Sequence, residues 1–155
     1  METTVDTVNR LFAEVFNDIV KIEQKALKEA GFEDITTTET HTVEAIDLYG
    51  DKDMSSVADK LDITVGTLTV SVANLVKKGY VLRSRSEADR RRVILRPTEK
   101  GKALLEAHRR FHMDMVSSAV LGLSEHETEV FRGALLNLSR FFTEKTKKRH
   151  TPELN

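Results

Sequence analysis

MSSVADKLDITVGTLTVSVANLVKKGYVLRSRSEADRRRVIL, residues 54–95, is the stretch that decides the fold of this chain. Apolar residues at helical spacing predict one helix over Ser55–Leu61 and a second over Val65–Lys78, with Asp62-Ile63 as the turn between them. Strand-forming residues then predict a β-hairpin with strands at 80–85 and 92–96. Helix, turn, helix and hairpin in this order predict a winged helix-turn-helix, which can place its second helix in a DNA major groove.

The predicted helix ends carry suitable boundary residues. Ser55 and Thr64 are N-cap candidates, because a hydroxyl oxygen there accepts a hydrogen bond from a free backbone N–H of the first turn. Gly79 is the expected end of the second helix, since glycine readily adopts the left-handed conformation that follows a helix. The core-facing side of that helix is predicted to carry Leu68, Val72, Leu75 and Val76.

Short polar side chains lie on the other side of the second helix, where they suit close approach to base edges and phosphates. Gly66 costs roughly 1 kcal/mol of helix propensity relative to Ala, but it lets the backbone approach a phosphate at the positive helix end. The hairpin loop adds a run of arginines. The candidate DNA-binding residues are Ser55, Thr64, Gly66, Thr67, Thr69, Ser71, Asn74, Arg85, Asp89, Arg90, Arg91 and Arg92.

Positive charge is concentrated around the hairpin, although the 155 residues together have a formal net charge of −1. Residues 77–110 contain twelve Lys and Arg but only four Asp and Glu, which gives this segment a net charge of +8. A locally basic surface attracts phosphates, so double-stranded DNA is the predicted partner.

Several protein classes are excluded by what the sequence lacks. There is no cysteine, which excludes disulfides and thiol-based redox sensing. No apolar run approaches the roughly 20 residues that span a membrane, and no signal peptide opens the chain, so we expect a cytoplasmic protein without a membrane partner. A Gly-rich phosphate loop, a His-Glu-x-x-His motif and a nucleophile elbow are all missing, so we do not expect an enzyme.

Further amphipathic helices are predicted at about 4–29, 38–49, 98–120 and 125–145. The first and the last two carry more apolar surface than one small domain can cover, and pairing of two chains would bury it. We therefore expect a mainly α chain, 1–155, with dimerisation helices in 1–35 and 99–145. Residues 36–98 form the winged helix-turn-helix DNA-binding region, which includes a two-stranded β-wing.

Four motifs follow one another at separations typical of one protein family. They are Leu61-Asp62-Ile63-Thr64, Leu75-Val76-Lys77-Lys78-Gly79-Tyr80-Val81, Asp89-Arg90-Arg91 and Thr98-Glu99-Lys100-Gly101. In these motifs the chain resembles the MarR family, which consists of dimeric winged-helix transcriptional regulators of bacteria. The resemblance implies a homodimer with two recognition helices about one duplex turn apart, and an operator that is pseudo-palindromic.

The resemblance also implies how the loop is built. In the family, the residues that match Asp89 and Arg91 pair with each other and brace the tip of the hairpin. Arg90 would then point toward the minor groove. The alternative is that Asp89 only caps the turn.

Three segments, 32–46, 84–91 and 108–112, resemble the fatty-acid-biosynthesis repressor branch of this family. That branch implies a long-chain acyl group on acyl carrier protein as co-repressor, held in an apolar tunnel, and no resident cofactor. Acyl carrier protein is acidic, so it would dock on an arginine-rich surface. The implied ligand-binding residues are Phe12, Phe16, Ile19, His41, His108, Phe111, His112 and Met115. For the apolar ones, ordinary dimer core is the alternative.

Three histidines give a second hypothesis for the effector. His108 and His112 are four residues apart and share one helix face, which suits a metal ion such as zinc. His41 is a third candidate ligand, with Glu23 or Glu44 as the carboxylate, and the zinc-sensing branch of the family has a comparable constellation. A polar cluster without metal is the alternative. A further alternative that the family resemblance implies is an effector of another kind, a small apolar or phenolic ligand that releases the regulator from DNA.

Overall fold

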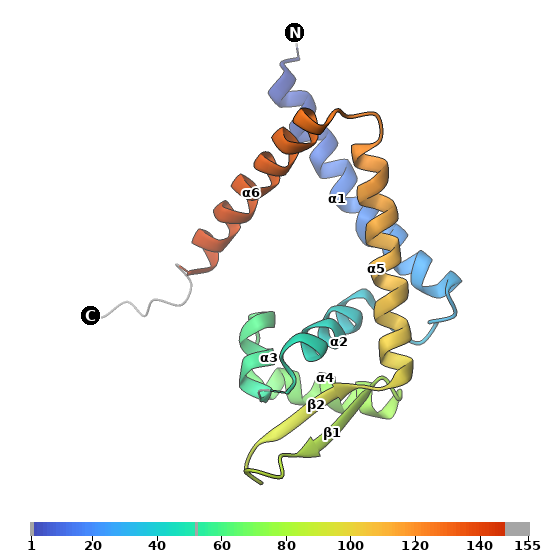
Figure 1. Ribbon diagram of the computed structural model, residues 1–155, viewed down its shortest axis with the longest axis vertical. Helices are drawn as coiled ribbons and strands as arrows, with labels where there is room; N and C mark the ends of the chain where they lie inside the picture. The colour runs from blue at the N-terminus through green and yellow to red at the C-terminus, as the bar shows by residue number, and fades with distance from the viewer. Residues whose placement is uncertain (1, 52, 148–155) are drawn as a thin grey trace, which may run out of the picture. The chain divides into compact units, whose positions relative to one another are not determined.

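The computed structural model describes residues 2–51 and 53–147. In this part of the chain, six helices and two strands follow one another as Figure 1 shows. Their bounds are α1 Thr4–Glu29, α2 Thr37–Tyr49, α3 Met54–Leu61, α4 Val65–Lys77, β1 Val81–Arg85, β2 Val93–Pro97, α5 Glu99–Val120 and α6 Glu125–Lys147. The strands pair antiparallel, with Val81 opposite Pro97 and Arg85 opposite Val93. The mainly α winged helix-turn-helix fold with a two-stranded wing is confirmed.

Side-chain caps explain where most helices begin. Thr3 and Thr36 open α1 and α2 as capping boxes with acidic residues three positions later. Ser124 and Glu127 form the capping box of α6, because the Ser124 N–H donates to the Glu127 carboxylate over 2.8 Å and the Glu127 N–H donates to the Ser124 hydroxyl. Thr64 caps α4 as predicted, accepting from the backbone N–H of Thr67.

The predicted N-cap of α3 is wrong by two residues. Asp53 is the cap, and its carboxylate accepts a hydrogen bond of 2.8 Å from the backbone N–H of Ser56. That hydrogen bond is the main reason why the pKa of Asp53 is lowered. Ser55 lies inside the first turn with its side chain exposed. The first helical residue, Met54, is buried, so its packing favours the earlier start.

The core of the winged region is made by α2, α3, α4, the two strands and the start of α5. Its fully buried large side chains include Ile46, Val57, Leu68, Val72, Leu75, Tyr80, Leu95 and Leu104. Three of the four predicted core residues of the second helix are therefore confirmed. Val76 is 40% exposed, which corrects the prediction that it faces the core.

The end of α4 is joined to the start of α5. Thr98 donates from its hydroxyl to the Gly79 carbonyl and from its backbone N–H to the Tyr80 carbonyl. The Lys100 ammonium donates to the Lys78 carbonyl and lies 4.0 Å from the centre of the Tyr80 ring. The Tyr80 hydroxyl donates to Asp34 and lowers the pKa of that carboxyl, while burial and the Asp34 carboxylate raise the pKa of Tyr80.

The chain divides into two compact units, residues 1–113 and 114–155, and the boundary falls within α5. In the first unit, α1 exposes a row of apolar side chains that includes Val5, Val8, Phe12, Val15 and Phe16. In the second unit, α6 exposes Val130, Leu135, Phe141 and Phe142. Within residues 2–51 and 53–147, no helix combines the length and apolar character that crossing a bilayer requires.

Candidate functional site

The second helix of the helix-turn-helix, α4, is held by a defined turn. Asp62 adopts the left-handed conformation, with φ of 55°, and its backbone N–H bonds to the carbonyl of Asp59. The apolar side chains of Leu68, Val72 and Leu75 then fix the orientation of α4 on the core. The opposite face of the helix is thereby presented to solvent, as a recognition helix requires.

The predicted contact residues of α4 lie on or beside this outward face. Thr64, Gly66, Thr67 and Asn74 are exposed, whereas Thr69 and Ser71 are half-buried. The Thr67 and Thr64 hydroxyls lie 2.9 Å apart, and the Thr69 hydroxyl donates to the Val65 carbonyl. One hydroxyl proton of the Thr64–Thr67 pair and the Thr69 hydroxyl proton are thus engaged locally, but the Thr67 and Thr69 oxygens each keep a lone pair that can accept from a base edge.

The hairpin loop between β1 and β2 is closed by backbone bonds and by one carboxylate. The Asp89 carboxylate accepts from the backbone N–H of Arg91 over 3.0 Å, and the Asp89 carbonyl accepts from Arg92 N–H. No ion pair joins the Asp89 carboxylate to the Arg91 guanidinium, both of which belong to the described part of the chain. Asp89 therefore caps the turn, which was the alternative prediction. The side-chain pair between Asp89 and Arg91 that the family resemblance implies is not formed in this structure.

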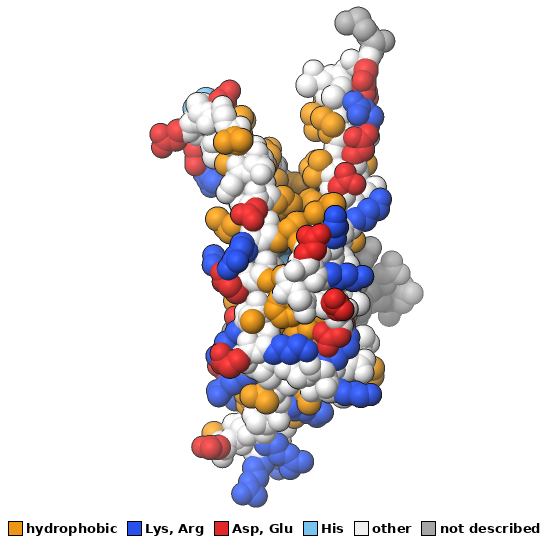
Figure 2. All heavy atoms as spheres, turned by 90° about the vertical axis from the view of Figure 1, so that its right-hand side faces the viewer, with side chains coloured by type: hydrophobic (Ala, Val, Ile, Leu, Met, Phe, Trp, Pro, Cys, Tyr) orange, Lys and Arg blue, Asp and Glu red, His pale blue; other side chains and the backbone are white. Residues whose placement is uncertain are grey.

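Several basic side chains of the segment 77–110 are paired with acidic residues. Lys78 pairs with Glu39, Arg96 with Asp51, Lys100 with Asp34, Lys102 with Glu99, and Arg109 and Arg110 with Glu106. Among the described residues, by contrast, no acidic side chain lies within 4.0 Å of the guanidinium groups of Arg83, Arg85, Arg90 and Arg91. Figure 2 shows Lys and Arg side chains at the lower end of the molecule, where Figure 1 places the hairpin. The wing thus carries four arginines without an acidic partner in the described chain, beside α4.

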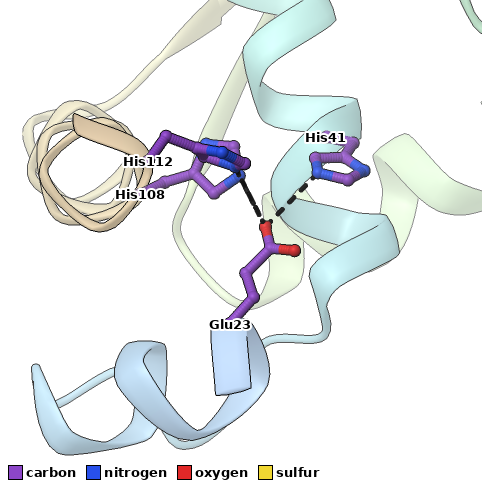
Figure 3. A group of neighbouring side chains, drawn as sticks. All are labelled: Glu23, His41, His108 and His112. Atoms are coloured by element: carbon purple, nitrogen blue, oxygen red, sulfur yellow. Dashed lines mark hydrogen bonds and ion pairs between the residues drawn. The ribbon is translucent and has the colours of Figure 1, made fainter. Parts of the chain in front are cut away.

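A second candidate site lies in the same unit, where α1, α2 and α5 meet (Figure 3). His108 Nε2 is 2.6 Å from Glu23 Oε1, and His112 Nε2 is 3.0 Å from His108 Nε2. His41 Nε2 approaches the same carboxylate oxygen to 3.4 Å. One ligand atom from each of the four residues lies within 4.8 Å of the other three, so the geometry can hold one metal ion.

Burial differs among the four residues of this site. Glu23 and His108 are 3% exposed, whereas the His41 side chain is 47% exposed. Burial lowers the pKa of His108, His112 lowers it further, and Glu23 partly opposes both effects. A neutral imidazole is the form that coordinates metal, so this environment favours the ligand state of His108.

The remaining predicted ligand residues differ in their exposure. Phe12 and Phe16 are on the exposed row of α1 and are 46% and 62% exposed. Ile19 and Phe111 are half-buried, and the Phe111 ring contacts the His112 ring at a centroid distance of 5.4 Å. Met115 is half-buried and belongs to the second unit.

The structure refines one prediction for these sites and adds one residue to them. Glu23 was one of two candidate carboxylates, and the structure selects it over Glu44, because Glu23 lies 2.6 Å from His108 and belongs to the four-residue group. Val70 was overlooked as an outward residue of α4, although the helical period alone places it opposite the buried side chains.

Comparisons with known proteins agree on one family. The MarR family profile matches residues 35–93. The HTH-type transcriptional regulator MhqR of Bacillus subtilis is 30% identical over 111 residues, which are 69% of this chain and 77% of MhqR. The crystal structure of Streptococcus pneumoniae FabT in complex with DNA has 38% identity and a TM-score of 0.83, covering 90% of this chain and 98% of that one. The S. aureus MepR–DNA complex, at 23% identity and a TM-score of 0.61 over 90% of this chain and 96% of that one, shares the fold.

Proposed function

Because this chain belongs to the MarR family and is thus a DNA-binding transcriptional regulator and not an enzyme, we propose that it represses fatty-acid-biosynthesis genes with long-chain acyl–acyl carrier protein as co-repressor. The observation that carries DNA binding is the group of wing arginines without an acidic partner, which lies beside the polar face of α4. Lys and Arg side chains that reach phosphates supply most of the affinity of such proteins, and a helix in the major groove supplies base contacts.

The proposed functional unit is a homodimer. The apolar rows on α1 and α6 are exposed in the single chain, and large exposed apolar patches mark interfaces. In a dimer with two-fold symmetry, the same apolar rows of both chains would be buried, and the two copies of α4 would face the DNA together. Two helices one duplex turn apart, about 34 Å, match a pseudo-palindromic operator.

The proposed co-repressor rests on likeness to the fatty-acid repressor branch. FabT has 38% identity over nearly its whole length, and segments 32–46, 84–91 and 108–112 resemble that branch. The apolar residues Phe12, Phe16, Ile19, Phe111 and Met115 are the proposed contacts of the acyl chain, and an arginine-rich surface would dock the acidic carrier protein. By population shift, the acylated carrier would favour the dimer in which the two recognition helices fit the operator.

Adding long-chain acyl–acyl carrier protein is expected to tighten operator binding by about five- to 150-fold, the range typical of allosteric coupling. The measurement is a fluorescence-anisotropy titration of a labelled promoter fragment of the host's fatty-acid genes at fixed salt. Carrier protein without an acyl group serves as control. Equal operator affinity with acylated and unacylated carrier protein would contradict the co-repressor hypothesis. Weaker operator binding with the acylated carrier would show that the acyl group is an inducer.

Regulation by a metal ion is a second candidate, favoured by the convergence of Glu23, His41, His108 and His112. Three imidazole nitrogens and one carboxylate oxygen form a ligand set that zinc accepts in tetrahedral geometry. The ligands come from three helices, so a bound ion would fix α1, α2 and α5 relative to one another. This device is compatible with the same DNA-binding wing and differs only in the effector.

Zinc is expected to bind with one ion per chain, and His108→Ala is expected to weaken binding at least a hundredfold, since each coordinating side chain supplies several kcal/mol of the total. Competition with a chromophoric chelator measures the affinity. His126→Ala, on exposed α6, is the matched control and should leave it unchanged. If wild type and His108→Ala bind zinc equally, the four residues are a polar cluster and not a metal site.

A further inference from the structure

One apolar side chain on α4 faces away from the core. Val70 is 65% exposed, against 43% for Val65 and 40% for Val76 on the same helix. Two residues along a helix correspond to about 200° of rotation, so Val70 is opposite the buried Leu68 and Val72. Its neighbours on this outward face are polar or small: Gly66, Thr67, Ala73, Asn74 and Lys77.

The fold itself gives no reason for a valine at this position. An exposed β-branched residue lowers helix stability relative to Ala, because its side chain loses rotamer freedom against the preceding turn. Val70 is absent from the buried core cluster and from the partly buried side chains packed against it. A partner outside the chain therefore accounts better for its exposed methyl groups.

The position of Val70 identifies that partner. It is in the middle of the face that α4 turns to solvent, between Thr67 and Asn74, and in the same unit as the unneutralised wing arginines. In the major groove, the C5-methyl group of thymine is the apolar feature of the base edges. We propose that Val70 contacts this methyl group and makes one thymine in each half-site a specificity determinant of the operator. The inference rests on the proposed binding of DNA by α4.

The test uses deoxyuridine, which differs from thymidine only by that methyl group. The purified protein first selects duplexes from a random-sequence library, so that affinity for the protein alone defines the probe. Each thymine of the selected duplex is then replaced by deoxyuridine, symmetrically in both half-sites. Anisotropy titrations compare wild type, Val70→Ala and the control Val76→Ala, which makes the same change on the same helix away from its outward face.

For wild type and Val76→Ala, deoxyuridine at one symmetric position is expected to weaken binding about fourfold per half-site and about fifteenfold per duplex, as loss of one buried methyl predicts. For Val70→Ala, the thymine and deoxyuridine duplexes are expected to bind equally, which a double-mutant cycle reports directly. The inference is overturned if every deoxyuridine duplex binds wild type as well as thymine does. It is equally overturned if the loss persists in Val70→Ala. If no duplex is enriched, the proposed DNA binding by α4 is itself contradicted. That outcome differs from the other two, which concern Val70 alone.

Discussion

Arg90→Ala is expected to weaken operator binding about a hundredfold. The guanidinium of Arg90 is exposed at the tip of the wing, and no acidic side chain of the described chain neutralises it. A hydrogen bond to a charged phosphate contributes about 1.5 kcal/mol or more, which is roughly tenfold in affinity, and a dimer loses it twice. The slope of log K against log salt should also become shallower by about 1.8, since each phosphate contact on duplex DNA contributes about 0.9.

The measurement is a set of anisotropy titrations at several salt concentrations, without carrier protein. Arg109→Ala removes the same charge from α5, where Glu106 already pairs with the guanidinium at 2.8 Å. This control should stay within about twofold of wild type. An unchanged salt slope for Arg90→Ala would show that this side chain does not reach phosphate, and Arg91 and Arg85 would then be tested in its place.

Gly50→Ala is expected to destabilise the folded chain by about 2–3 kcal/mol, as overpacking against backbone does. Gly50 follows α2, and its carbonyl accepts a hydrogen bond of 3.1 Å from the Leu95 N–H of β2. A Cβ at this position would overlap the carbonyl oxygen of Leu95, and neither backbone segment can move away without breaking that bond. The midpoint of thermal unfolding should fall by about 5–10 °C.

Gly66→Ala is the matched control for that substitution. The nearest atom to a Cβ at Gly66 is the Thr64 hydroxyl oxygen at 3.8 Å, which is ordinary contact. The alanine should therefore stabilise α4 by about 0.5–1 kcal/mol. Thermal unfolding of both variants followed by circular dichroism separates the two effects. Equal midpoints for the two variants would contradict the steric argument at Gly50.

Local signals in the sequence were sufficient for most of the fold. The bounds of α1 were predicted correctly, and Gly79 and Gly122 follow helices with φ of 80° and 84° as glycines can. The start of α3 was not predictable from local preference, because Asp53, Ser55 and Ser56 are all acceptable caps. The burial of Met54, a tertiary contact, decides among them.

The two candidate sites also differ in how far local sequence signals could predict them. The arginine wing and α4 are contiguous in sequence, so charge and helical period were enough to find them, apart from Val70. The four-residue site is not contiguous, because Glu23 and His108 are 85 positions apart and meet only through the packing of α1 on α5. From the amphipathic pattern, Glu23 is one of several acidic residues on a long helix. Its burial against His108 distinguishes it from the others.

The hydrogen bonds that tie Thr98 and Lys100 to the residues directly after α4 also have a mechanical consequence. They join the start of α5 closely to the end of α4. Gly101 allows this close approach, because a side chain at this position would overlap the Tyr80 carbonyl. A displacement of the start of α5 is therefore expected to move the end of α4 as well. A ligand bound at His108, which lies further along α5, is therefore expected to change the orientation of α4 without contacting it.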